Sequence, residues 1–130
     1  MQTVIDIHLN ARADIQTIAL SDKKAASAVI AALEHAATDP NILDKLTTHG
    51  DNGVGGLRLG VKQWLSIKRS ANLWRFRIFD TPATMYRVIY GYQWQTRQVL
   101  ILAVVHKEHF NYDDHNSDIV RRIVNDWGNL

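Results

Sequence analysis

The chain has no cysteine, two prolines and no long hydrophobic run among its 130 residues. The absence of cysteine excludes disulfide bridges, thiolate zinc sites and thiol nucleophiles. The longest uninterrupted apolar segment, Val99–Val105, is too short to cross a bilayer as a helix. The N-terminal residues lack the basic region and apolar stretch of a secretory signal. We therefore expect a cytoplasmic protein that binds no membrane.

The composition is that of an ordinary globular domain. Hydrophobic residues make up 46% of the chain and charged residues 22%, which excludes extended disorder. The length matches one domain and is too short for two ordinary ones. We expect residues 1–130 to form a single domain with its own core.

Positive charge is concentrated in the middle of the chain. The segment Arg58–Arg97 has eight basic residues and one acid, a net charge of +7, whereas the remainder has seven basic and twelve acidic residues, a net charge of −5. Many such segments are simply solvated surface. Here Arg75 and Arg77 alternate with apolar residues, so a strand would project both guanidinium groups from one face. Clustered arginines attract polyanions, and we expect a nucleic-acid surface that also includes Lys68 and Arg69.

The N-terminal half predicts one strand and two helices. Residues Thr3–Leu9 alternate apolar and polar side chains, as in a half-buried strand. Ser21 and Asp22 can cap an amphipathic helix that runs to Ala37, and a second helix is expected over Asp39–Gly50. Five of the seven glycines then fall between residues 50 and 60. This segment does not match a phosphate-binding loop, because no lysine follows the last glycine and no apolar strand leads in, so we expect a mobile loop.

The second half predicts three strands and a helix. The strand candidates are Leu73–Phe79, Met85–Tyr90 and Val99–Val105, and the last is apolar on both faces, as is typical of a central strand. Residues Asn116–Asp118 can cap a short helix that ends at Gly128. The order β-α-α-β-β-β-α predicts an α+β domain: an antiparallel sheet of about four strands with an N-terminal helix pair and a short C-terminal helix.

Four segments of the second half, LWRFRIFD (73–80), YRVIY (86–90), VLILAVVHKEHFNYDD (99–114) and IVRRIVNDW (119–127), carry a resemblance to a known family. In this order and spacing they resemble the RelE/ParE superfamily of toxins from type II toxin–antitoxin systems. The resemblance covers Leu73–Trp127, and the strand–helix–helix start fits by architecture alone. It implies a compact α+β domain neutralised by a cognate antitoxin, for which the helix pair over Ser21–Gly50 is the expected docking surface. The RelE-like branch cleaves mRNA in the ribosomal decoding site.

The resemblance also implies roles for basic residues. Arg87, from the Tyr-Arg-x-x-Tyr segment, matches the family's phosphate-clamping arginine. Arg75 and Arg77 stand where the family often has lysine or arginine on the preceding strand. Lys107 occupies a position where arginine is more usual, and an ammonium group supplies a point charge rather than a bidentate fork.

Three titratable residues, His106, His109 and Tyr112, lie at and just beyond the end of the apolar strand. Metal-independent RNA cleavage needs a base for the 2′-hydroxyl, an acid for the leaving 5′-oxygen and cations around the phosphorane-like transition state. Relatives place acid, base or base-stacking residues in this region. Because histidine exchanges protons near neutral pH, we favour His109 or His106 over Tyr112. We expect the imidazoles and the guanidinium groups to share one concave patch.

A metal site is an alternative for the same region, with His106, His109 and His115 beside Asp113 and Asp114. The two histidines in His-Lys-Glu-His are three residues apart and leave a strand, unlike the helical His-Glu-x-x-His of zinc proteases. We expect neither a metal nor another cofactor.

The sequence therefore predicts a type II toxin that is an endoribonuclease (an mRNA interferase), acts on mRNA at the ribosome and inhibits translation. Two alternatives stay open: a ParE-like, non-enzymatic inhibitor of DNA gyrase, and an inactive relative that only binds RNA or protein. Titratable groups beside clustered arginines favour the nuclease, since a pure binder does not need them.

Overall fold

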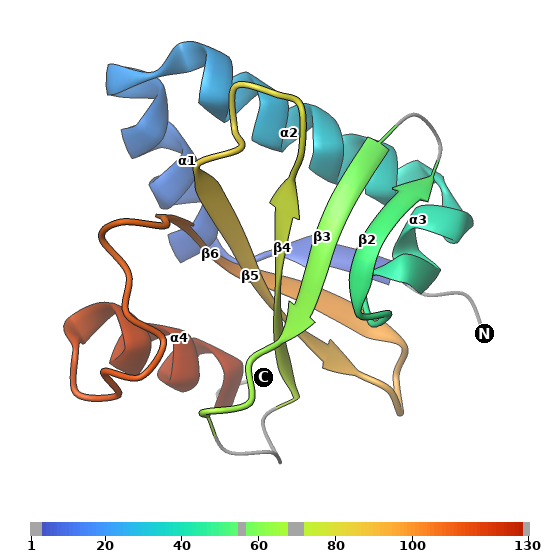
Figure 1. Ribbon diagram of the computed structural model, residues 1–130. Coiled ribbons are helices and arrows are strands. Elements are labelled where there is room, and N and C mark those ends of the chain that lie inside the picture. Colours follow the sequence, from blue (N-terminus) through green and yellow to red (C-terminus); the bar gives the residue numbers. More distant parts are fainter. Residues whose placement is uncertain (1–3, 55–56, 68–71, 129–130) are drawn as a thin grey trace.

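The computed structural model describes residues 4–54, 57–67 and 72–128, which form six strands and four helices (Figure 1). In chain order these are β1 (Val4–Ile7), α1 (Leu9–Ser21), α2 (Lys23–Thr38), α3 (Pro40–Lys45), β2 (Gly50–Val54), β3 (Leu57–Gln63), β4 (Leu73–Ile78), β5 (Tyr86–Gln93), β6 (Gln98–His106) and α4 (Asp118–Gly128).

The strands form one mixed sheet in the order β1-β6-β5-β4-β3-β2. Strands β2 to β6 are an antiparallel meander, and β1 joins it at the β6 edge as a parallel neighbour. The expected α+β class is confirmed. The expected sheet of about four antiparallel strands and the order β-α-α-β-β-β-α match only roughly, because a hairpin and a helix were missed and β1 pairs with β6 in parallel.

The missed helix is α1. Its buried residues Ala11, Ile15 and Ile18 follow the spacing of one helical face, but the expected strand over Thr3–Leu9 extended into its first turn. The strand ends at Ile7 because the imidazole of His8 accepts a hydrogen bond from the backbone N–H of Asn10 and caps the helix.

The missed hairpin is β2–β3, within the segment expected to be a mobile loop. In β3 the side chains of Leu59 and Val61 are buried, whereas Arg58 and Lys62 are exposed. This alternation is the ordinary signal of a half-buried strand, and the high glycine content obscured it. The hairpin also shortens the second expected helix, which ends as α3 at Lys45 rather than at Gly50.

The sheet separates two apolar cores. One core lies between the sheet and the helices α1, α2 and α3, and the other lies between the sheet, α4 and the segment that connects β6 to α4 (Figure 1). Strand β6 contributes to both cores, as expected of a central strand, and lies between β1 and β5. A register shift opposite Ile89 and Tyr90 turns two consecutive residues, Leu102 and Ala103, toward the α4 side.

A polar network ties α4 to α1 across the end of the sheet. The guanidinium group of Arg122 donates to both carboxylate oxygens of Asp14, at 3.0 and 2.7 Å, and to the carbonyl of Leu102. The same carboxylate accepts from the backbone N–H of Val104, so it fixes the irregular part of β6. The bidentate pair ties α4 to α1, although the Arg122 Nε is buried without a hydrogen-bond partner among the described residues.

The close fit of α4 also depends on a glycine in β5. A Cβ at Gly91 would approach the indole ring of Trp127 to 2.5–2.6 Å. The absence of a side chain at Gly91 leaves room for the Trp127 ring, so the last turn of α4 packs directly on the backbone of β5.

We predict that Gly91→Ala displaces Trp127 and destabilises the protein by about 1–3 kcal/mol, the usual cost of overpacking a core. The measurement is the free energy of unfolding in urea. Gly53→Ala is the matched control, since a Cβ at Gly53 meets no atom within 4 Å. An equal loss of stability in both variants would contradict the role of Gly91 in leaving room for Trp127.

Candidate phosphate-binding site

Four cations share the α4 side of the sheet: Lys62 on β3, Arg75 and Arg77 on β4, and Arg87 on β5. We call this set the arginine face. Strand alternation directs Trp74, Phe76 and Ile78 into the helix-covered core, so Arg75 and Arg77 point the other way. Lys62 lies directly opposite Arg75 in the β3–β4 register, which brings their charges together. The structure thus places Arg75, Arg77 and Arg87 on one face, as the sequence indicated.

Arg87 is the most buried of the four, with 7% of its surface exposed. Its Nη1 donates to the carbonyl oxygens of Thr84 and Tyr86, each at 3.0 Å, so the guanidinium group is held by the backbone. Burial lowers the pKa of Arg87, and repulsion from Arg75 and Arg77 lowers it further. The guanidinium group nevertheless stays charged in the physiological range.

No ion pair among the described side chains involves Lys62, Arg75, Arg77 or Arg87. The described ion pairs of Arg58 and Arg122 are made with Asp80, Asp14 and Asp126, and none involves a member of the arginine face. Uncompensated cations that repel one another raise the energy of the free protein. An anion that binds between them would relieve this repulsion.

Tyr112 closes one side of the arginine face. The Arg75 guanidinium carbon lies 5.9 Å from the centre of its ring, and Trp64 and Phe110 pack edge-on against it at 5.4 and 4.8 Å. The indole N–H of Trp64 donates to the Tyr112 carbonyl at 3.0 Å, which anchors this segment to the chain beyond β3. The buried hydroxyl group of Tyr112 has no protein partner within the described ranges.

The phenol of Tyr112 stays neutral over a wide pH range. Burial raises its pKa, and the positive charges of Arg75 and Arg87 oppose this rise only in part. A neutral phenol can donate a proton to a developing anion, but it is a poor proton acceptor. The Tyr112 hydroxyl is therefore a neutral, buried hydrogen-bond donor.

A cleft runs along the outer part of the arginine face. It has a volume of about 250 Å³ and is lined by Gly50, Gly60, Val61, Lys62, Arg75, Arg77 and Phe79. Lys62 and Phe79 were not among the candidates from the sequence. The alternation of Lys62 with Val61 could have revealed the first, had β3 been recognised as a strand.

The two candidate imidazoles lie on the other face. His106 is opposite Tyr86 in the β5–β6 register, and its ring packs edge-on against the Tyr86 ring at 5.2 Å. His109 stacks on His106 at 4.8 Å. Tyr86 belongs to the core under α1 and α2, whereas Arg87 points to the α4 side. The expectation that the imidazoles share the arginine patch is wrong, because His106 falls on the opposite phase of its strand.

The remaining candidates are distributed around the site. Lys107 is exposed at the turn after β6, where its backbone N–H donates to the Met85 carbonyl. Lys68 and Arg69 lie outside the described residues. Across residues 4–54, 57–67 and 72–128, no group of three or more His, Asp or Glu side chains is arranged to hold a metal ion.

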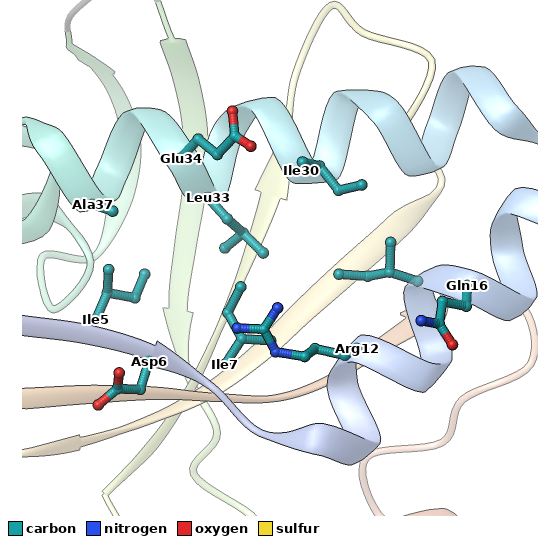
Figure 2. A pocket seen from close by; sticks show the side chains of 10 residues that line it. Ile5, Asp6, Ile7, Arg12, Gln16, Ile30, Leu33, Glu34 and Ala37 are labelled. Carbon is teal, nitrogen blue, oxygen red and sulfur yellow. The ribbon is translucent and has the colours of Figure 1, made fainter.

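A second hollow lies on the helix side of the sheet, between β1, α1 and α2 (Figure 2). Its volume is about 430 Å³. Ile30 and Leu33 of α2 point into it across from Ile7 of β1. Apolar side chains dominate the lining, and the charges at its rim are of both signs: Asp6, Arg12 and Glu34. It therefore lacks the cationic character of the arginine face.

No family model, curated protein or solved structure matches this chain. Within the described part of the chain, no helix has the length and apolar content that a membrane span requires. The arginine face combines clustered cations with a cleft, which is the arrangement that phosphate binding requires.

We predict that Tyr112→Phe leaves the free energy of unfolding at neutral pH unchanged or raises it by up to about 1 kcal/mol, because the removed hydroxyl is buried without a partner. In the wild type, the raised pKa values of Tyr112 and Tyr90 stabilise the fold below the unfolded tyrosine pKa of about 10. This stability is lost as the pH rises through the folded values.

The measurement is urea unfolding between pH 7 and pH 11. Tyr112→Phe should lose less stability above pH 10 than the wild type, because one raised tyrosine pKa is removed. The variant and the wild type share all the other tyrosines, so the titration of those residues cancels in this comparison. A larger loss of the free energy of unfolding above pH 10 in the variant than in the wild type would contradict the raised pKa of Tyr112.

Proposed function

We propose that this chain is a RelE-like toxin of a type II toxin–antitoxin system that cleaves mRNA and thereby inhibits translation. One observation carries the proposal: three arginines and a lysine share a sheet face without a described carboxylate partner. In this proposal the ribosome presents the mRNA, the site of action is the cytoplasm, and a cognate antitoxin neutralises the protein.

The arrangement supports phosphate binding of the kind that RNA cleavage requires. Arginine forks bind phosphate oxygens in a bidentate manner and stabilise the extra negative charge of the transition state. Arg87 is preoriented by its backbone hydrogen bonds, which reduces the entropy lost when it binds a phosphate. Arg75 lies between Arg87 and the cleft and would bind an adjacent part of the RNA backbone.

Proton transfer is assigned to the groups near this face. Tyr112 contacts Arg75, and its neutral phenol suits protonation of the leaving 5′-oxygen. His106 is the last residue of β6, one register position from Arg87. Because the two imidazoles pack on Tyr86 on the opposite face, they do not reach the phosphate that Tyr112 contacts. In this proposal the proton of the 2′-hydroxyl therefore passes to water, and Lys107 stays exposed at the turn after β6.

A second function is favoured by the separation of the imidazoles from the arginine face. If the cations act only as an electrostatic docking surface, no proton transfer group is needed beside them. A ParE-like, non-enzymatic inhibitor of DNA gyrase fits this arrangement, because its effect depends on binding alone.

We predict that expression of the chain without an antitoxin arrests growth, and that Arg75→Ala or Arg87→Gln relieves the arrest. Each change removes one cation of the arginine face, and the loss of a charged contact to a transition-state phosphate costs about 100-fold to 1,000-fold in rate, as for other transition-state donors. The measurement is growth and protein synthesis after induction. Arg12→Ala on α1 removes one positive charge from the helix side and should leave the arrest intact.

Circular dichroism and urea unfolding of the purified variants show whether they fold. Arg75→Ala tests the site even if the buried Arg87 proves necessary for stability. A folded wild-type protein that does not affect growth would refute both toxin functions.

We predict that mRNA from induced cells carries new 5′ ends inside reading frames, because the proposed reaction cuts the backbone between a 2′-hydroxyl and the 5′-oxygen that leaves. Sequencing of 5′ ends is the measurement. Tyr112→Phe should reduce cleavage by about 100-fold or more if the phenol is the acid. Intact mRNA together with lost plasmid supercoiling would instead establish the gyrase inhibitor.

A further inference from the structure

The residue that follows β4, Phe79, contacts two arginines. The guanidinium carbon of Arg77 lies 4.2 Å from the centre of the Phe79 ring, and that of Arg58 lies 4.7 Å away. Both distances are within the range of cation–π attraction. Arg58 is also tied to Asp80 by a 3.3 Å ion pair, so it has a carboxylate partner. Arg77 has none among the described residues, and the aromatic ring is its described contact.

A glycine of β3 provides the space for the Phe79 ring. A Cβ at Gly60 would lie 3.0 Å from two ring carbons of Phe79. Gly60 is opposite Arg77 in the β3–β4 register, and the backbone N–H of Phe79 donates to the Arg58 carbonyl at 2.9 Å. The ring is therefore fixed over the end of β3 by the backbone of two strands.

The ring and Arg77 both line the 250 Å³ cleft, together with Lys62 and Arg75. A guanidinium group 4.2 Å from a ring centre is restrained by that contact. No hydrogen bond from the Arg77 side chain to another described group accompanies it, so its N–H donors can serve an anion.

We propose that Lys62 and Arg77 form a second phosphate subsite, next to that of Arg87 and Arg75, and that Phe79 is the positioning residue for Arg77. The ligand class is the phosphate group of a single RNA strand. This inference rests on the proposed function, because it assigns a neighbouring nucleotide of the same bound RNA. Arg77 acts by direct contact with the phosphate, whereas Phe79 acts through Arg77.

The test is a double-mutant cycle on the purified full-length protein. The probe is a short, labelled single-stranded oligoribonucleotide with 2′-O-methyl groups, which binds but cannot be cleaved. Fluorescence anisotropy gives its dissociation constant for the wild type, Arg77→Ala, Phe79→Leu and the double variant. Because the cycle compares Phe79→Leu with and without Arg77, it isolates their coupling from a general effect of the substitution.

We predict that Phe79→Leu weakens RNA binding about threefold to tenfold, the range expected from loss of a partly exposed cation–π contact. In the Arg77→Ala background the same substitution should have no effect. The slope of log affinity against log salt should fall by about 0.7 in Arg77→Ala and by a smaller amount in Phe79→Leu, since one phosphate contact of a single strand is lost or weakened. Phe79→Tyr should restore wild-type affinity.

A second route perturbs the ring without replacing it. Gly60→Ala should push Phe79 away and weaken binding in the same direction as Phe79→Leu, again only while Arg77 is present. Gly53→Ala, on the neighbouring strand of the same hairpin, has open space for its Cβ and should bind like the wild type.

The outcomes separate the subsite from the proposed function. If Phe79→Leu weakens binding equally with and without Arg77, the positioning role is overturned. If Arg77→Ala and Lys62→Ala both bind like the wild type while Arg75→Ala does not, the second subsite is overturned and the proposed function stands. If the wild type itself does not bind the oligoribonucleotide, the second subsite is overturned, whereas the proposed function is tested separately by the growth arrest and by the new mRNA 5′ ends.

Discussion

The repulsion among cations on one face of the sheet is the constraint on which the functional interpretation depends. Burial lowers the pKa of Arg87, repulsion from Arg75 and Arg77 lowers it further, and no described ion pair involves these three arginines. For the buried Arg87, folding therefore costs solvation and brings the charge near like charges. An external anion changes the balance, because phosphate oxygens supply both charge and acceptors.

The rest of the fold supports this face and limits access to it. Helices α1 and α2 cover the opposite side of the sheet (Figure 1), and the Asp14–Arg122 pair ties α4 to α1. The Trp64, Phe110 and Tyr112 cluster forms a wall at one side, and Phe79 borders the cleft. Rigid surroundings of this kind hold the guanidinium groups in place before a ligand arrives.

Local patterns predicted much of the second half of the chain. The alternation around Arg75 and Arg77 correctly indicated their common face, and the doubly apolar β6 was correctly expected in the middle of the sheet. The β2–β3 hairpin was missed because glycines mask the alternation of Leu59 and Val61. Helix α1 was missed because its first turn directly follows β1, separated only by the capping His8.

The sequence by itself determined the common face of Arg75 and Arg77 and the α+β class, because charge and side-chain periodicity are local properties. Tertiary structure decided which titratable groups join the arginines. The phase of β6 turned His106 toward Tyr86, where His109 stacks on it, and the chain after β6 folded back to bring Tyr112 against Arg75. Tertiary structure also packed the Phe79 ring, just after β4, against Gly60 of β3. The pattern of residues along the chain does not predict this contact. Such contacts depend on the register of neighbouring strands and the path of a loop, which only packing in three dimensions sets.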